Sequence, residues 1–159
     1  MRLELVQLGS GAHALAIQIM GNPDDAADAV QDALTKALEQ PNAYDASRGS
    51  LKTWFLRVVR NRCIDLIRSR KPQDERVELL ADGGIGPEMA AERADVSRLL
   101  ERSLAAIDPD HRQIVVLRDY LDLPYAEIAS VLEIAPGTVM SRLHRARLAL
   151  AKVYREYDE

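Results

Sequence analysis

The sequence predicts an all-α protein made of two small helical domains joined by a flexible linker. Apolar residues recur at helical spacing over most of the 159 residues, and no segment alternates as a half-buried strand would. A polar stretch rich in Gly and Pro, from residue 72 to about residue 88, separates two helical halves. The predicted organisation is therefore a first domain at residues 1–72, a linker at 73–95 and a second domain at 96–159.

The composition excludes several functional classes. The single cysteine, Cys63, rules out internal disulfides and a multi-cysteine metal site, and His13, His111 and His144 share no metal-ligand spacing. No phosphate-binding loop, nucleophile elbow or dinucleotide fingerprint occurs, so we expect no catalytic residue, no metal and no cofactor. The absence of a membrane-spanning run or a signal peptide predicts a cytoplasmic protein without membrane insertion.

The first long helix is predicted at residues 24–40. Alanines and other apolar residues recur at helical spacing, acidic residues occupy the first turn where the helix dipole favours them, and Pro41 ends the helix. The polar face is acidic and carries Asp24, Asp25, Asp28, Gln31 and Asp32. By itself such a face is most simply solvated, and a catalytic use is not expected without a nearby His, Cys or Gly-rich loop.

A loop at residues 42–50 is followed by a second long helix that runs to about residue 70, with Ser50 as its cap. This helix interleaves cationic residues with aromatic ones, the mixture that grips phosphates and unstacked bases of single-stranded nucleic acid. The candidate contacts are Lys52, Trp54, Arg57, Arg60, Asn61 and Arg68. Trp54 also falls on the apolar face, so a core role and a base-contacting role both stay open.

The second domain is predicted to contain helices at residues 91–106 and 109–120, the latter capped by Asp108. Residues 123–129 and 136–147, separated by a short break, then have the pattern of a helix-turn-helix. Its second helix buries one apolar stripe and turns polar side chains outward, where they can reach base edges and phosphates. The candidate contacts are Thr138, Met140, Ser141, Arg142, His144 and Arg145. Any two-helix corner with a solvated face would be the simpler interpretation.

The net charge of −4 conceals a segregated distribution. Residues 21–47 and 72–108 are acidic, whereas residues 48–71 and 138–155 are basic. This alternation predicts two contacts with nucleic acid and at least one surface for a basic partner.

Three segments together resemble bacterial RNA polymerase sigma factors of the extracytoplasmic-function (ECF) group. They are residues 21–32, residues 50–61 and the helix-turn-helix at 123–147, and the resemblance extends over roughly residues 12–72 and 96–154. It implies a region 2-like first domain and a region 4-like second domain. Two departures are that residues 1–8 precede Gly9 and Gly11, where the family has a longer opening helix, and that Met140 stands where Lys or Arg is common.

The resemblance also implies partners and roles. The acidic residues of 24–32 would dock on core RNA polymerase, and the basic helix after Ser50 would open the −10 promoter element as a single strand. The loop at 42–50 together with Asn61 would hold a flipped base, and residues 138–145 would read the double-stranded −35 element. An anti-sigma factor is a further implied partner.

Two other functions remain alternatives from the sequence. An ordinary helix-turn-helix transcriptional regulator would act without capturing polymerase and would use residues 1–70 for dimerisation or sensing. A helical adaptor would use the acidic face to bind a basic partner and would have no role at promoters. None of the three functions is enzymatic.

Overall fold

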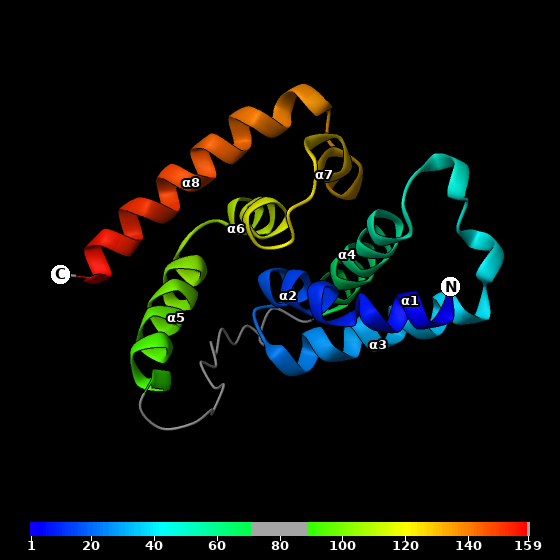
Figure 1. The fold of residues 1–159 in the computed structure, drawn as a ribbon, viewed down its shortest axis with the longest axis horizontal. Helices are drawn as coiled ribbons and strands as arrows, with labels where there is room; N and C mark the ends of the chain where they lie inside the picture. Colours follow the sequence, from blue (N-terminus) through cyan, green and yellow to red (C-terminus); the bar gives the residue numbers. More distant parts are fainter. Residues whose placement is uncertain (71–88, 159) are drawn as a thin grey trace.

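The computed structural model describes residues 1–70 and 89–158 of the chain. Throughout these residues the regular structure is helical (Figure 1). One group of helices lies within residues 1–70 and a second group within residues 89–158. The predicted all-α, two-domain fold is thereby confirmed. Most of the predicted linker lies outside the described residues. The first helix after them begins at Met89, where the sequence predicts that helical spacing of apolar residues resumes.

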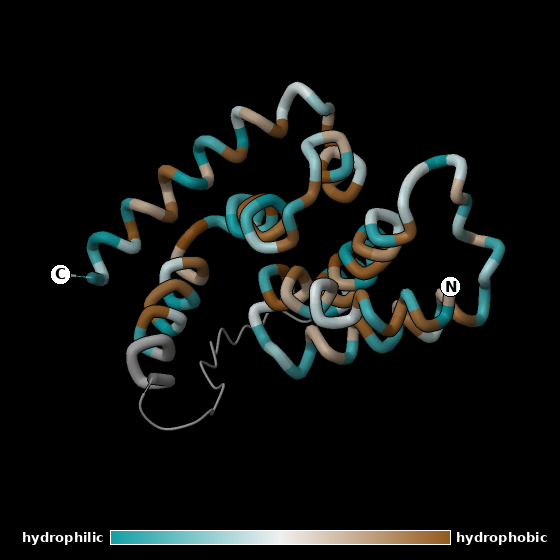
Figure 2. The backbone as a smooth tube through the Cα atoms, in the orientation of Figure 1, coloured by the Kyte–Doolittle hydropathy of each residue, from teal (hydrophilic) through white to brown (hydrophobic). Residues whose placement is uncertain are grey.

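The first domain is a small helical bundle. Its elements are α1 (Arg2–Gln7), α2 (Gly9–Met20), α3 (Pro23–Glu39), the short 3₁₀ turns η1 (Pro41–Ala43) and η2 (Ala46–Arg48), and α4 (Leu51–Ser69). Helices α2, α3 and α4 pack against one another, and α1 contacts all three. Apolar residues, brown in Figure 2, gather on the sides of the helices that face each other.

The opening helix is short, as expected from the sequence, because α1 ends at Gln7 and a separate helix, α2, begins at Gly9. Gly9 and Gly11 both lie within α2, which continues to Met20. The helix ends at Gly21, whose φ of 72° is the left-handed conformation that favours glycine after a helix. The opening layer is therefore two consecutive helices that meet at Leu8.

Helix α3 approaches its neighbours through small side chains. Ala26, Ala29, Ala33 and Ala37 recur along one face and are at most 3% exposed. The helix begins at Pro23, one residue before the predicted start, and Asn22 caps it by accepting hydrogen bonds from the backbone N–H groups of Asp24 and Asp25 (2.8 and 3.2 Å). The alanine face leaves the polar side chains of α3 on the surface.

Helix α4 is capped by Ser50, whose Oγ accepts from the backbone N–H of Thr53 at 3.1 Å. Its buried stripe includes Phe55, Val59 and Cys63, each fully buried. Trp54 lies at the rim of this stripe, half-buried, with its ring centroid 5.4 Å from that of Tyr44. The two aromatic residues that the sequence placed together thus differ, since Phe55 belongs to the core and Trp54 to its edge.

The second domain contains α5 (Met89–Ala106), α6 (Pro109–Val115), the π-helical segment η4 (Val116–Tyr120), α7 (Tyr125–Leu132) and α8 (Pro136–Asp158). The predicted helix from 109 to 120 is present, but its last turn widens, with the Leu121 N–H bonded to the Val116 carbonyl at 2.9 Å. Helix α8 packs against α5, α6 and α7. The turn after α7 passes through Glu133, which has a φ of 55°.

The two domains touch. Helix α7 packs on α4, and α6 packs on α2, so segments more than 50 residues apart in the sequence lie side by side (Figure 1). As a result the buried apolar residues of both domains form one continuous cluster.

Core packing of α8 can be tested with two of its leucines. Leu143 is 1% exposed, whereas Leu148 is 56% exposed. We expect Leu143→Ala to lower the free energy of unfolding by about 2–5 kcal/mol, because it leaves a cavity in the core. Leu148→Ala should change it by less than about 0.5 kcal/mol. Chemical denaturation followed by far-UV circular dichroism measures both, and equal losses would contradict the assigned faces.

Candidate nucleic-acid interface

The candidate −10 contacts lie along an arc of α4 outside its buried stripe, and the second domain covers one side of that arc. Lys52 Nζ donates to the carbonyl oxygen of Leu121 at 3.0 Å, and Arg57 Nη1 donates to Ser130 Oγ at 3.1 Å. Arg60 Nε donates to Oε1 of the buried Gln113 at 3.0 Å. Three of the predicted nucleic-acid contacts thus bond to the second domain in this structure.

The electrostatic surroundings of Arg60 reflect this closeness. Burial lowers the pKa of its guanidinium below the usual value, while the nearby carboxylates of Glu133 and Asp110 act in the opposite direction. Arg142, a predicted −35 contact on α8, is close enough to add a further lowering by charge repulsion. The charges of two side chains that are predicted to meet different stretches of DNA therefore repel each other here.

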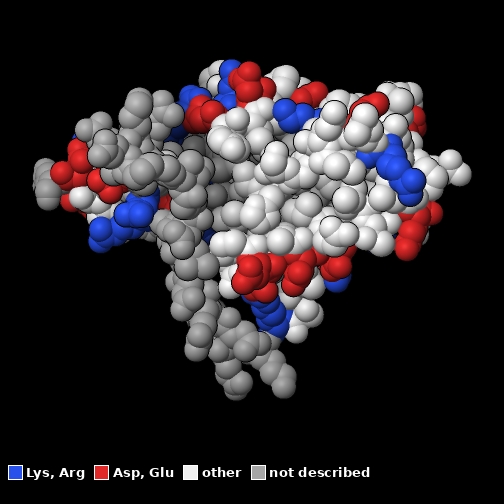
Figure 3. Space-filling view, turned by 60° about the horizontal axis from the view of Figure 1, so that its bottom comes forward, with Lys and Arg blue, Asp and Glu red and all other residues white. Residues whose placement is uncertain are grey.

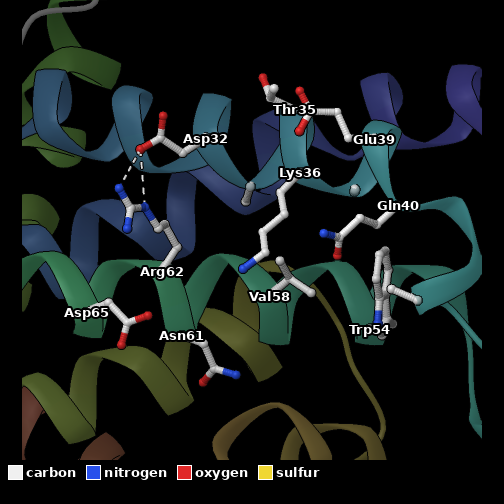
Figure 4. A pocket seen from close by; sticks show the side chains of 13 residues that line it. Asp32, Thr35, Lys36, Glu39, Gln40, Trp54, Val58, Asn61, Arg62 and Asp65 are labelled. Atoms are coloured by element: carbon white, nitrogen blue, oxygen red, sulfur yellow. Dashed lines mark hydrogen bonds and ion pairs between the residues drawn. The ribbon is translucent and has the colours of Figure 1, made fainter.

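Other candidates on α4 lie toward α3. Trp54 and Asn61 line a groove of about 660 Å³ between the two helices. In Figure 4, Lys36 extends from α3 toward Val58, Gln40 lies close to Trp54, and Asn61 points away from α3. Arg68 and Asn61 are exposed. The predicted −10 residues are consequently divided between a face turned to the second domain and a face turned to α3 and solvent.

A smaller cavity of about 110 Å³ lies beneath the loop that joins α3 to α4. Its lining includes Tyr44, Trp54, Arg57 and, from the second domain, Ser130. Aromatic rings beside a guanidinium are the groups that hold an unstacked base. Asn61, which the sequence paired with this loop, lines the α3–α4 groove instead. Tyr44 was missed by the sequence reasoning, although it is the aromatic residue of an otherwise polar loop.

The loop itself is held by short-range hydrogen bonds. Tyr44 OH donates to the carbonyl of Gly49 at 2.9 Å, and Gly49 has a φ of 151°. Asp45 Oδ1 accepts from the Oγ and the backbone N–H of Ser47 at 2.6 and 3.0 Å, and these bonds lower the pKa of the Asp45 carboxyl. The aromatic pair is thus presented by an ordered turn.

The acidic face of α3 is concave and partly paired. Asp25, Asp28, Gln31 and Asp32 line a hollow of about 320 Å³ together with Leu66 of α4 and Arg70, the residue that follows α4. Asp25 forms an ion pair with Arg70, and Asp32 Oδ2 accepts from Arg62 at 3.0 and 3.2 Å. Asp24 and Asp28 are exposed. Figure 3 shows acidic side chains gathered in a row on the surface of the first domain, with basic side chains beside them.

The predicted −35 contacts share the outward side of α8. Val139, Leu143 and Ala146 are buried, whereas Ser141, His144 and Arg145 are exposed and Met140 is 66% exposed. Thr138 and Arg142 are half-buried. Ser141 Oγ donates to the carbonyl of Thr138 at 3.2 Å. The structure therefore brings the six candidates to one surface of the helix.

A two-point ion pair joins α8 to the π-helical segment η4. Arg147 donates to both carboxylate oxygens of Asp119, from Nε at 3.1 Å and from Nη2 at 2.5 Å. These hydrogen bonds raise the pKa of Arg147 further above its ordinary value. Arg147 is thereby directed toward η4.

Comparison with known proteins identifies the family. Residues 6–73 match the model for Sigma-70 region 2, and residues 97–150 match the model for Sigma-70, region 4. The ECF RNA polymerase sigma factor SigW of Bacillus subtilis is 31% identical over 157 residues, which cover 91% of this chain and 83% of that protein. The chain belongs to the ECF sigma factors. The resemblance predicted from the three sequence segments is confirmed.

Other relatives agree with this assignment. SigL of Mycobacterium tuberculosis, also an ECF sigma factor, is 32% identical over 145 residues, covering 89% of this sigma factor and 81% of that one. The sigma factor RpoE of Bartonella quintana, solved in complex with the anti-sigma factor NepR, has a TM-score of 0.75 and 26% identity over 96% of this chain and 95% of its own. CnrH, solved with the cytosolic domain of CnrY, shares the fold, with a TM-score of 0.66 and 22% identity over 98% of this chain and 97% of its own.

The family assignment decides between the functions left open by the sequence. An ECF sigma factor directs RNA polymerase to promoters, and the relatives do not favour the ordinary helix-turn-helix regulator. Among the described residues, no group of three or more His, Cys, Asp or Glu side chains is placed to hold a metal ion. No helix in the described part of the sigma factor has the length and apolar character needed to cross a membrane.

Cys63 is a core residue of α4. Its side chain is fully buried, and burial raises the pKa of the thiol to about 11. This agrees with the sequence-based interpretation of Cys63 as a small apolar side chain.

The buried thiol gives a pH-dependent prediction. At about pH 9 the native thiol should be about 1% ionised, against about half in the unfolded chain, because the thiolate is disfavoured by burial. We therefore expect iodoacetamide to alkylate the native protein at least about fiftyfold more slowly than the urea-unfolded protein. Mass spectrometry over time measures both rates, and equal rates would show that Cys63 is accessible.

Proposed function

We propose that this sigma factor uses α4 at the −10 element, α8 at the −35 element and the acidic face of α3 on core RNA polymerase. The observation that carries the proposal is that the two basic helices belong to separate domains while the acidic residues form a third, distinct surface. Two basic modules on one chain can bind two promoter elements together, because engagement of one raises the effective concentration of the other.

At the −10 element, cationic side chains of α4 would contact phosphates of the opened strand, and the Tyr44–Trp54 pair would stack on an extruded base. The cavity beside this pair supports the assignment, since Arg57 lines it as well. The residues proposed for this element are Lys52, Trp54, Arg57, Arg60, Asn61 and Arg68. Holding an extruded base offsets part of the unstacking free energy, a few kcal/mol.

At the −35 element, the outward face of α8 would enter the major groove of the duplex. The residues proposed for this contact are Thr138, Met140, Ser141, Arg142, His144 and Arg145. Arg145 is exposed at the middle of the surface and can bond a guanine edge in the two-point manner. Met140 offers an apolar contact where a cation would otherwise bind phosphate, which should alter sequence preference.

Core polymerase would bind the hollow on α3 lined by Asp25, Asp28, Gln31 and Asp32, with Asp24 at its end. Leu66 gives this charged hollow an apolar floor. The ion pairs to Arg62 and Arg70 are half-exposed, so a basic partner can compete for these carboxylates.

The remaining assignments follow from this function. We propose domain boundaries of 1–72 and 96–159 around the linker, an anti-sigma factor as a regulatory partner, as in the RpoE–NepR complex, and no catalytic activity. The place of action is then the cytoplasm, where the polymerase transcribes.

The polymerase contact is tested by a charge reversal at Asp28. Asp28→Lys should weaken capture of core polymerase by about tenfold or more, because a cation replaces an exposed anion facing a basic surface. Co-purification and light-scattering titration measure the affinity. Glu39→Lys, the same reversal on an exposed residue at the other end of α3, is the control. Undiminished capture by the Asp28 variant with retained helicity would discard the docking face.

The −35 contact is tested by removing one guanidinium. Arg145→Ala should cost about 1–3 kcal/mol of binding and relax specificity at one base pair. Arg155→Ala removes the same charge from an exposed position near the end of α8 and should leave specificity unchanged. Competition binding with −35 duplexes, taken from transcription starts mapped after overexpression, measures the difference. Identical selectivity in the two variants would remove Arg145 from the reading face.

The function as a whole is tested by run-off transcription with core polymerase, with and without the chain, on those mapped promoters. We expect transcription that depends on the chain and on both elements. Binding to a palindromic duplex without stimulation of polymerase would instead indicate the ordinary regulator.

A further inference from the structure

Helix α8 carries one more arginine on the side that is proposed to face DNA. Arg147 follows Met140 by seven residues, which is close to two helical turns, so the two side chains lie on the same side of the helix. Both side chains are exposed. The guanidinium of Arg147 is nevertheless bonded to Asp119 of η4, and Arg147 is therefore not among the −35 contacts proposed above.

The position of Arg147 along α8 is suited to a phosphate. The first turns of a recognition helix enter the major groove and meet base edges. Arg147 comes two residues after Arg145, the last of the proposed base contacts. At 1.5 Å per residue it lies about 10 Å along the axis from Met140. Because the major groove is about 12 Å wide, a side chain this far along the helix reaches the rim of the groove, where the phosphates lie.

The carboxylate of Asp119 is itself fixed in place. The residue before it, Arg118, donates to the carbonyl oxygen of Leu123 at 3.0 Å. Arg118 Cζ also lies over the ring of Tyr125, 5.5 Å from its centroid, and Arg118 forms an ion pair with Asp122 at 3.7 Å. These contacts brace the turn between η4 and α7, so Asp119 is held where it meets α8.

The ion pair withdraws Arg147 from other anions in two ways. Its Nε and Nη2 donate to the two carboxylate oxygens of Asp119 at 3.1 and 2.5 Å, the same two-point geometry in which a guanidinium holds a phosphate. The carboxylate also balances the charge of the guanidinium, so a phosphate is attracted less strongly to it. Both side chains are close to half exposed, which leaves the pair within reach of a duplex bound to α8.

We propose that Asp119 withholds Arg147 from DNA and thereby limits the sequence-independent part of duplex binding by α8. The inference rests on the proposed role of α8 at the −35 element. Asp119 is a positioning residue, because it acts through the direction and charge of Arg147 and touches no base itself. Binding to a −35 duplex then depends on base contacts, with one phosphate contact fewer than the arginines of α8 allow.

The proposal is tested by removing one carboxylate. Asp119→Asn keeps the size of the side chain and frees Arg147. Asp122→Asn is the matched control, since it removes the same charge three residues later from an exposed side chain that pairs with Arg118 instead. Asp122 has a φ of 57°, which asparagine also tolerates. The double variant Asp119→Asn/Arg147→Gln removes both charges of the pair and keeps the net charge of the parent. Far-UV circular dichroism checks the helicity of each variant.

Fluorescence anisotropy measures binding of the full chain to two labelled duplexes of about 20 base pairs, one with a mapped −35 sequence and one with that sequence scrambled, between about 50 and 200 mM salt. We expect Asp119→Asn to bind both duplexes about fivefold more tightly at about 50 mM salt, because one phosphate contact is added. The slope of log affinity against log salt should become steeper by about 0.9. Asp122→Asn should change the slope by less than about half of that amount, and the double variant should bind as the parent does.

Each outcome decides the proposal. If Asp119→Asn keeps its helicity and binds no more tightly than Asp122→Asn, the proposal is wrong and the pair is only structural. A gain confined to the mapped duplex also overturns it, because a phosphate contact does not depend on sequence. If the slope of the double variant is shallower than that of the parent by about 0.9, Arg147 already contacts a phosphate in the parent, and nothing is withheld.

A second variant serves if Asp119→Asn loses its helicity. Arg147→Lys keeps the cation but loses the two-point bond to Asp119, so its slope should also be steeper than that of the parent. An unchanged slope for Arg147→Lys would then overturn the proposal. Failure of the proposed function would show differently, as a parent protein that does not prefer the mapped duplex to the scrambled one.

Discussion

The helical repeat of α4 constrains the rest of the molecule. One stripe of this 19-residue helix must be buried, and Phe55, Val59 and Cys63 fill it. Every cationic side chain of the helix is thereby confined to the remaining circumference, where three environments meet. These are the acidic helix α3, the second domain and solvent, and different arginines contact each of them.

This division explains how one helix can belong to several interactions. Arg62 and Arg70 neutralise carboxylates of α3 and hold the acidic surface in shape. Arg57 and Arg60 instead meet uncharged oxygens, which satisfy their donors without competing strongly against an anion. Arg62 and Arg70 thus have charged partners on α3, whereas Arg57 and Arg60 have uncharged partners on the second domain.

Local sequence signals predicted the elements well. The caps Ser50 and Asp108 and the alanine and leucine periodicities set the helix limits that the structure shows. The helical wheel also placed Val139, Leu143 and Ala146 in the core of the second domain. These features depend on residues within a few positions of one another, so the positions of the helices and their buried faces can be predicted from a single sequence.

Contacts between distant segments were not predictable in the same way. Nothing local indicates that Lys52 meets Leu121, that Arg112 reaches Gln18, or that Tyr44 and Trp54 form a pair. The helical conformation of Gly9 and Gly11 within α2 is likewise not predicted by local propensity, since glycine is a poor helix former. The proposed sites therefore depend on the family resemblance more than on the fold.

The alanine face of α3 has a consequence for how the surface can change. Because Ala26, Ala29, Ala33 and Ala37 have no room to grow, a larger side chain at any of them would push the whole helix outward. The paired carboxylates of Asp25 and Asp32 would move with it, away from their partner arginines at the end of the first domain. The distance between α3 and the helices it packs on, which is set by the methyl groups of these alanines, therefore determines the spacing of the charges that a partner meets.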